Sequence, residues 1–209
     1  MIGMDSTPLR TYGGVTGGDR QAERRAQLVE AGLDLLGARD GERTVSVRGV
    51  CRQAGLAARY FYESFADRDA FALAVYDQVV RDIAATTLDA VNAAPPQAQA
   101  KIHAGLARLV RVLADDPRRG RLLFSPALAG TLPATSRAES TRLFVELLGM
   151  QAREFYGVPE SPRLAITAEL LVGGFAQTLT SWLDGTLAAT EEEIVEHCAA
   201  IFGAVAEKI

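Results

Sequence analysis

The sequence predicts an all-α protein of about nine helices. Apolar residues recur at three- and four-residue spacing through most of its 209 residues, which is the spacing of one face of a helix. No run keeps the strict apolar–polar alternation of a half-buried strand. Only 7% of the residues are aromatic, and this favours an aliphatic helical core over a β-rich one.

Composition narrows the class of protein further. With 48% hydrophobic and 23% charged residues, the chain is too apolar for intrinsic disorder. Its two cysteines cannot form a disulfide framework, and residues 1–18, expected as a flexible leader, lack the apolar stretch of a secretory signal. We therefore expect a cytoplasmic protein. Arginine outnumbers lysine by 20 to 2, which suggests a GC-rich bacterial genome.

The N-terminal third is expected to hold one longer helix and two short ones. The longer helix covers residues 19–39 and is ended by Gly41. Ser46 is expected to cap a short helix that Gly55 breaks. The second short helix covers residues 58–65.

Capping signals divide the rest of the chain into further helices. Asp67 begins a long helix that Pro95-Pro96 end. Asp116-Pro117 and Ser161-Pro162 are each a cap followed by proline at the first helical position. Thr190 and the glutamate three residues later form a capping box.

Residues 164–183 could be taken for a membrane span, because they are about long enough to cross a bilayer and carry one charge, Glu169. Gln177, several Ser and Thr residues and the absence of a Lys/Arg-rich flank argue against this. A helix buried in a bundle or across a subunit interface accounts for the segment better, and no membrane association is expected.

Residues 46–68 carry the strongest functional signal. They read as two short helices joined by a tight turn, a helix-turn-helix. Ala54 and Gly55 are small residues placed where the helices would cross, and glycine can adopt the positive φ that the turn needs. Five apolar residues supply the buried face: Val47, Val50, Leu56, Phe61 and Phe65.

The same span has a local excess of positive charge and exposed groups suited to DNA. Residues 44–68 carry a net charge of +2, in a chain whose net charge is −4. Arg59 can reach O6 and N7 of guanine, and Ala58 or Tyr60 can contact a thymine methyl. The same helix also exposes Ser64, and four residues at the rim are expected to hold phosphates: Ser46, Arg48, Tyr62 and Arg68.

These residues resemble the DNA-binding domain of the tetracycline-repressor (TetR) family of transcriptional regulators. The resemblance covers roughly residues 20–80 and rests on the stretches SVRxVCxxAGL and YFYxxFxDRDAF. It implies that the helix at residues 58–64 enters the major groove. It also implies that Tyr62 and Arg68 contact phosphates.

The chain departs from the family pattern at several positions. Ala57 stands where a capping residue is common and cannot cap, which costs about 1 kcal/mol. Ala58 truncates a position that is often polar, so base reading falls to Arg59 and Tyr60. Arg68 replaces the commoner lysine and could hold a phosphate through two hydrogen bonds.

The resemblance implies the remaining architecture. Residues 19–66 would form the helix-turn-helix domain and residues 67–209 a helical ligand-binding and dimerisation domain, with the helix from residue 67 joining them. A homodimer would form through the helices at 161–187 and 190–209 and bind a palindromic operator in double-stranded DNA. A small-molecule effector would release the dimer, which makes a repressor the expected function.

The effector is expected to be apolar or aromatic, because ligand cavities are mostly apolar with few polar groups. Six residues are candidates for the pocket, with core packing, interface packing or simple exposure as the alternatives: His103, Phe124, Phe144, Phe155, Phe175 and Trp182.

Other chemistries find little support. Two cysteines and two histidines at scattered positions do not make a zinc site, and the glycine-rich run at 13–18 lacks the residues of a phosphate loop. No nucleophile motif or carboxylate pair stands out. We expect no enzyme, no metal and no cofactor. The alternative to a regulator is a helical ligand-binding or protein-interaction module without specific DNA binding.

Overall fold

The computed structural model describes residues 17–38, 45–124, 132–157 and 159–208, and this part of the chain forms nine α-helices without a strand. The all-α prediction is confirmed. In chain order the helices are α1 (Gly17–Leu36), α2 (Val47–Ala54), α3 (Ala58–Tyr62), α4 (Arg68–Ala93), α5 (Ala98–Asp115), α6 (Pro117–Phe124), α7 (Ala134–Tyr156), α8 (Pro162–Leu183) and α9 (Glu191–Ala206).

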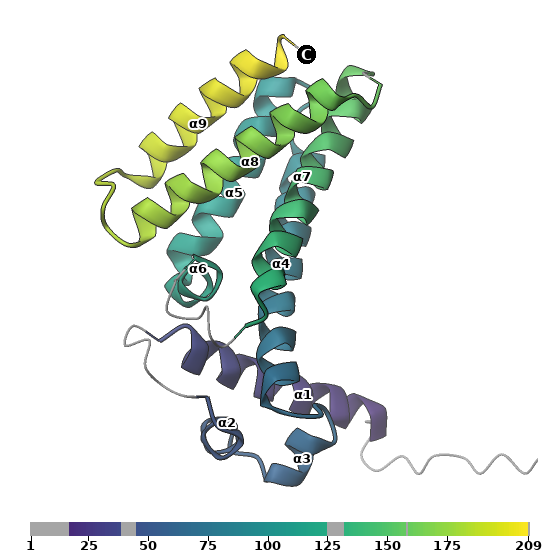
Figure 1. Cartoon of the computed structure of the whole chain (residues 1–209), viewed down its shortest axis with the longest axis vertical. Helices are drawn as coiled ribbons and strands as arrows, with labels where there is room; N and C mark the ends of the chain where they lie inside the picture. Colours follow the sequence, from purple (N-terminus) through teal and green to yellow (C-terminus); the bar gives the residue numbers. More distant parts are fainter. Residues whose placement is uncertain (1–16, 39–44, 125–131, 158, 209) are drawn as a thin grey trace, which may run out of the picture.

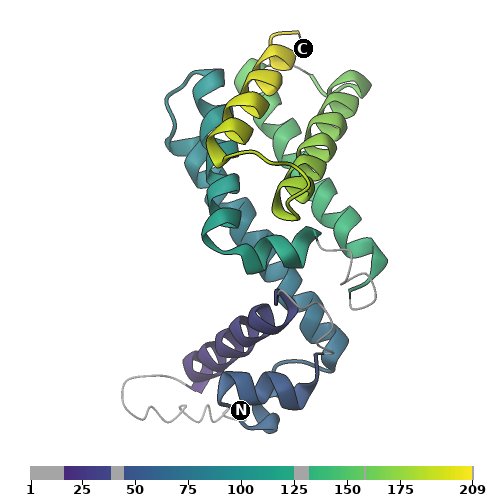
Figure 2. The same cartoon turned by 90° about the vertical axis from the view of Figure 1, so that its left-hand side faces the viewer.

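The helices gather into a small group and a larger one (Figures 1 and 2). α1, α2 and α3 form the small group, and α5 to α9 form the larger group. α4 belongs to both, because its first turns pack on α1 and the rest of it packs on α5. Within the larger group α9 packs on α5 and α8 packs on α7. The division into domains at residue 67 remains a prediction.

The predicted capping residues begin the helices as expected. The side chains of Ser46, Asp67 and Ser161 each accept a backbone N–H from the first turn of the helix that follows. Thr190 and Glu193 form the complete capping box. These bonds satisfy N–H groups that have no partner within the helix, so the local sequence alone sets these four boundaries.

Four helices end earlier than predicted. α8 ends at Leu183 rather than at residue 187, and α9 ends at Ala206 rather than at residue 209. α1 ends at Leu36 rather than at residue 39, and the carbonyl of Gly37 turns to accept a bond from Arg121 of α6. α3 ends at Tyr62 rather than at residue 65, although Phe65 still donates to the carbonyl of Phe61 at 2.9 Å in the turn that follows. The predicted stop at Gly41 lies outside the described residues. α1 begins two residues before its predicted start, and the other residues of the predicted leader also lie outside the described part.

Buried side chains form one continuous core from Leu28 to Phe202. On α4 every fourth residue from Phe71 to Ile83 is apolar, and Phe71, Val75 and Ile83 are almost completely buried. Because this face begins against α1 and continues to Ile83, it joins the core of the small group to that of the larger one.

None of the helices in the described ranges is long and apolar enough to cross a membrane. α8, which contains the segment considered for that role, instead packs against α7, and its residues Phe175 and Leu179 enter the core.

Candidate functional site

α3 exposes the side chains predicted to read DNA bases. Phe61 is completely buried on the inner face of this helix. Ala58, Arg59 and Tyr62 are exposed on the outer face, and Tyr60 is half-buried at its edge. The ring of Tyr62 packs edge-on against Phe61 at a centroid distance of 5.5 Å, yet 62% of the tyrosine stays exposed.

Tyr60 lies between two arginines. The guanidinium of Arg59 lies 4.5 Å from the centre of the Tyr60 ring and also donates to its hydroxyl. The guanidinium of Arg24, from α1, lies 4.2 Å from the same ring. The hydrogen bond to Tyr60 raises the pKa of Arg59 above its ordinary value, so Arg59 keeps its positive charge at any physiological pH.

α1 holds the C-terminal end of α3 from the other side. Arg24 forms an ion pair with Glu63 at 3.7 Å, and Gln21 donates to the carbonyl of Glu63 at 3.4 Å. Sequence reasoning missed Gln21 and Arg24 because they lie about 40 positions from Glu63, and no local pattern connects the two segments. Their effect is to fix the direction in which α3 presents Arg59.

The residues predicted at the rim lie at the start of α2, after α3 and at the start of α4. The hydroxyl of Ser46 accepts the N–H of Gly49 at 3.1 Å, which leaves the hydrogen of the hydroxyl available as a donor. Arg68 is half-exposed and bonds Asp69 at 3.1 Å. Arg48 is exposed and has no ion-pair partner within the described ranges. Ser64 is half-buried beside the end of α3.

The turn between α2 and α3 differs in one detail from the prediction. Gly55 has a φ of +67°, as expected for the turn, but a Cβ added to it would meet no atom within 4 Å. The glycine is therefore needed for backbone conformation and not for a close helix crossing. Ala57 precedes α3 without a side-chain cap, as the sequence indicated.

A cavity of about 510 Å³ lies within the larger group of helices. α4, α5, α7 and α8 contribute most of its walls, with further residues from α6 and α9. Four of the six predicted pocket residues line it: Phe124, Phe144, Phe155 and Phe175.

The other two candidates lie elsewhere. His103 is half-exposed, and its Nε2 lies within hydrogen-bond distance, 3.0 Å, of a carboxylate oxygen of Glu196 on α9. The indole N–H of Trp182 donates to the carbonyl of Ala189 at 3.0 Å, which ties the end of α8 to the loop before α9. Neither residue belongs to the cavity wall. Helical periodicity indicates that His103 and Trp182 lie on apolar helices. It does not indicate which neighbouring helix or cavity each face of those helices contacts.

The cysteines and acidic residues suggest no further chemistry. Cys51 is buried between the helices of the small group and Cys198 is half-buried on α9, and burial raises the pKa of both thiols. Raised pKa values keep thiols protonated and unreactive near neutral pH. Across the described ranges, no three Cys, His, Asp or Glu side chains come together as metal ligands would.

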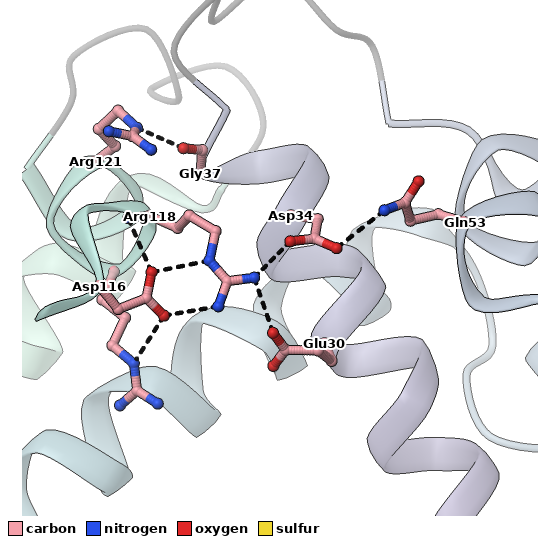
Figure 3. Close-up of polar contacts among 8 residues, drawn as sticks. Glu30, Asp34, Gly37, Gln53, Asp116, Arg118 and Arg121 are labelled. Atoms are coloured by element: carbon pink, nitrogen blue, oxygen red, sulfur yellow. Dashed lines mark hydrogen bonds and ion pairs between the residues drawn. The ribbon is translucent and has the colours of Figure 1, made fainter.

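Arg118, at the start of α6, connects the two groups of helices (Figure 3). Its guanidinium bonds both carboxylate oxygens of Asp116 at 2.8 Å, and it also bonds Glu30 at 2.8 Å and Asp34 of α1. Asp34 in turn accepts the side-chain amide of Gln53 on α2 at 3.0 Å. One arginine of the larger group is thus bonded to α1 and, through a shared carboxylate, to the helix-turn-helix.

The backbones of α1 and α6 also approach each other closely at this junction. A Cβ on Gly37 would lie 2.6 Å from the carbonyl oxygen of Arg118, so only glycine lets α6 lie against the end of α1. Arg121 bonds the carbonyl of the same glycine. The other end of α6 reaches the cavity, where Leu123 and Phe124 form part of the wall. α6 therefore touches both the cavity and α1.

The fold, the exposed face of α3 and the cavity together define a class of protein. It is an all-α protein in which a helix-turn-helix is joined to a helical region that encloses a cavity. No family model matches the sequence. Nor does any curated protein match it. Solved structures do match, and the chain has the fold of the TetR-family transcriptional regulators. The resemblance stated for residues 20–80 is thereby confirmed at the level of the fold, and it extends to the larger group of helices.

Three of these structures serve as examples. A putative TetR-family regulator from Syntrophomonas wolfei is 16% identical, with a TM-score of 0.71 over 88% of this chain and 95% of that one. The fatty acid degradation regulator FadR from Bacillus halodurans is 14% identical, with a TM-score of 0.70 over 84% and 96%. FadR from Bacillus subtilis, solved in complex with stearoyl-CoA, is 14% identical, with a TM-score of 0.66 over 84% and 96%.

Proposed function

We propose that this chain is a sequence-specific DNA-binding transcriptional regulator, a repressor that leaves its operator when a small apolar molecule enters the cavity. One observation carries the proposal: α6 touches both the wall of the cavity and the helix that braces α3. The fold of the solved regulators supports it, and so does the exposure of Arg59 on α3. A regulator also accounts for these features better than an enzyme does.

The proposal gives each surface residue a role. Arg59 pairs with guanine in the major groove, and Tyr60 and Ala58 contact bases beside it. Arg48, Ser46, Tyr62, Ser64 and Arg68 hold the phosphates and fix the register. Arg24 of α1 positions Tyr60 and Glu63 and so acts through α3 rather than on DNA.

The proposed dimer interface is the outer face of α8 and α9. Ile166 and Leu170 on α8 are 61% and 71% exposed, and Ile201 on α9 is 52% exposed. Gly174 continues the α8 stripe, and a Cβ on it would meet nothing within 4 Å. Contiguous apolar surface of this kind marks an interface, and a second copy with two-fold symmetry would bury it.

Leu170→Asp tests the dimer. We expect the variant to sediment as a monomer and to lose operator affinity by at least an order of magnitude, because one half-site then binds alone. Arg108→Gln, which changes an exposed residue on α5, is the control and should remain a dimer. A Leu170→Asp protein that stays dimeric would place the interface elsewhere.

Release from DNA requires the cavity and α3 to be coupled. A ligand that contacts Phe124 and Leu123 changes the position of α6, and Arg118 passes that change to Glu30 and Asp34 on α1. Because α1 braces α3 through Arg24, the two recognition helices of the dimer move out of the spacing that DNA requires.

Selection of bound sequences from a random duplex pool at two salt concentrations tests the function. The protein should first be unfolded and refolded so that any bound ligand is removed. We expect a palindrome with half-sites about 34–36 Å apart or a multiple of that, and affinity that falls steeply with salt. If the ligand-free dimer enriches no sequence, the chain is instead a helical ligand-binding or interaction module.

A further inference from the structure

An acidic side chain follows the proposed base-reading arginine at a distance of one helical turn. The arginine is Arg59 of α3, and the residue four positions later is Glu63. Arginine and glutamate at this spacing on a helix lie close enough to form an ion pair. The structure pairs them differently, because the carboxylate of Glu63 lies 3.7 Å from the guanidinium of Arg24 on α1, whereas Arg59 donates to the hydroxyl of Tyr60. The acid is thus paired with the arginine that has no proposed contact with DNA.

The backbone between Arg59 and Glu63 keeps a helical course. The N–H of Glu63 donates to the carbonyl of Arg59 at 3.0 Å, and Glu63 has helical dihedral angles, φ −68° and ψ −23°. The charge of Glu63 also acts on Arg59. The hydrogen bond to Tyr60 contributes most to raising the pKa of Arg59, and the negative charge of Glu63 raises it further. Glu63 is therefore an alternative partner within reach of the Arg59 guanidinium.

An ion pair between these two residues would compete with DNA. The donors of a guanidinium that bond O6 and N7 of guanine are the same planar donors that bond a carboxylate. The side chain of Glu63 is 47% exposed, so it has room to turn toward Arg59. A surface ion pair of this kind changes an equilibrium by about two- to threefold. An Arg59 bonded to Glu63 would give up that factor whenever it bound guanine.

Two residues of α1 hold Glu63 in its present position. Arg24 bonds its carboxylate, and Gln21, one turn earlier on α1, donates to its backbone carbonyl at 3.4 Å. Arg24 is itself fixed, because its guanidinium also lies 4.2 Å from the centre of the Tyr60 ring. The guanidinium of Arg59 lies 4.5 Å from the centre of the same ring. Tyr60 therefore positions both arginines, and of the two only Arg24 bonds the acid.

We infer that Arg24 sets the base preference of α3 indirectly: it holds the carboxylate of Glu63 and so leaves the guanidinium of Arg59 available to guanine. Arg24 is then a positioning residue that needs no contact with DNA. This inference rests on the proposed function and adds to it a residue that determines specificity. Loss of Arg24 lowers the preference for guanine as well as the overall affinity, and the loss of preference depends on the charge of Glu63.

Arg24→Gln tests the effect on base preference. The measurement is fluorescence anisotropy on the selected palindrome and on the same duplex with adenine in place of the guanine that Arg59→Ala identifies. We expect the ratio of the two affinities to fall about two- to threefold, because Glu63 is then free to pair with Arg59. Arg25→Gln is the matched control, since it removes the next cation of α1, whose guanidinium lies 5.0 Å from the centre of the Phe65 ring. It should leave the ratio unchanged, whereas an unchanged ratio in Arg24→Gln would overturn the inference.

A second substitution separates this role from a structural one. Glu63→Gln keeps the shape of the side chain but removes its charge, so it no longer offers Arg59 an ion pair. In the double variant Arg24→Gln/Glu63→Gln the affinity ratio should return to the natural value. Glu63→Gln alone should keep that ratio, because no acid then has to be held away from Arg59. A double variant that stays as impaired as Arg24→Gln would show that Arg24 acts by its own contact with DNA or with Tyr60, and would contradict the inference.

Nuclear magnetic resonance without DNA tests the inference apart from the proposed function. The Nε–Hε signal of Arg59 should shift in Arg24→Gln, because the guanidinium exchanges Tyr60 for Glu63, and it should move back toward its natural position in the double variant. A signal that stays in place in Arg24→Gln would refute the inference. If the natural protein binds a specific operator but Arg24→Gln keeps the guanine preference, only the inference fails. If the refolded protein enriches no sequence, the proposed function fails, and the Arg59 signal still reports whether Arg24 keeps Glu63 from Arg59.

Discussion

The aromatic residues at the centre of the small group are packed differently from those that line the cavity of the larger group. In the small group Phe61, Phe65 and Phe71 pack on one another at centroid distances of 5.0–5.5 Å and are almost completely buried. In the larger group Phe144 and Phe155 face a cavity, and 39% of Phe155 remains exposed. Under the proposed function, the surface that matches DNA needs one rigid shape, whereas the region that admits a ligand needs space that can change.

The largest effect expected from this comparison is on stability. Phe61→Ala should lower the free energy of unfolding by about 3–5 kcal/mol, because it empties a closely packed site. Phe144→Ala should cost well under half as much, because that ring already borders open space. Urea denaturation followed by circular dichroism measures both. Equal losses would mean that the larger group is as closely packed as the small one.

The next effect is on DNA recognition. Arg59→Ala should lose about 1–3 kcal/mol of discrimination at one base pair of each half-site, because its contacts to guanine disappear. Arg68→Ala should weaken binding to all sequences alike and reduce the salt slope by about one. Fluorescence anisotropy on the selected palindrome and on single-base variants separates the two. An unchanged preference in Arg59→Ala would show that the register of α3 is misassigned.

The junction between the two groups should respond more weakly. Arg118→Gln breaks the ion pairs to Glu30 and Asp34, and we expect the opening free energy of α6 to fall by about 1 kcal/mol. Operator-induced protection should then stop at α1 and no longer extend into α6. Hydrogen exchange with and without the palindrome measures this.

Arg119→Gln is the matched control for the junction. Arg119 also approaches Asp116, at 3.4 Å, but within the described ranges it makes no hydrogen bond or ion pair to α1. Its substitution should leave the protection of α6 intact. If both variants behave alike, the ion pairs to α1 transmit nothing and α6 acts only through its backbone contact with Gly37.

The smallest effect is a dependence on pH. The hydrogen bonds from Arg118 hold the pKa of Asp116 below its ordinary value, so this carboxylate stabilises the fold above about pH 4 and loses that contribution as the pH falls further. Asp116→Asn should be less stable at pH 7 by under about 1 kcal/mol. The gap between the urea midpoints of the variant and the natural protein should narrow as the pH falls below about 4. A gap that stays constant down to the lowest pH at which the protein folds would show that packing, not charge, explains the difference.

The helix-turn-helix could be predicted from the sequence because the residues that set its helix ends and its turn act on their near neighbours in the chain. Ser46 and Asp67 cap helices within their own first turn, and Gly55 supplies a positive φ within the turn itself. Each needs only neighbours three or four residues away. The functional surface of α3 follows from the same short stretch, because Phe61 inside determines that Arg59 lies outside.

The residues that line the cavity could be predicted only in part from the sequence, because they are spread from residue 76 to residue 206. The expectation that aromatic residues line a ligand cavity named Phe175 and Phe124, which border the cavity, and equally Trp182, whose indole turns to the carbonyl of Ala189. An apolar side chain on a helix packs against another helix or against empty space, and the sequence of one helix does not distinguish the two.

By itself, the sequence determined the all-α class, the capped helix boundaries and the helix-turn-helix, since each depends on interactions within a few residues. Only the tertiary structure decided that Arg24 braces Tyr60, that Arg118 joins α6 to α1, and that residues of α4, α5, α7 and α8 enclose one cavity. These contacts join segments tens of positions apart. The packing of whole helices fixes their geometry, and no local pattern encodes it.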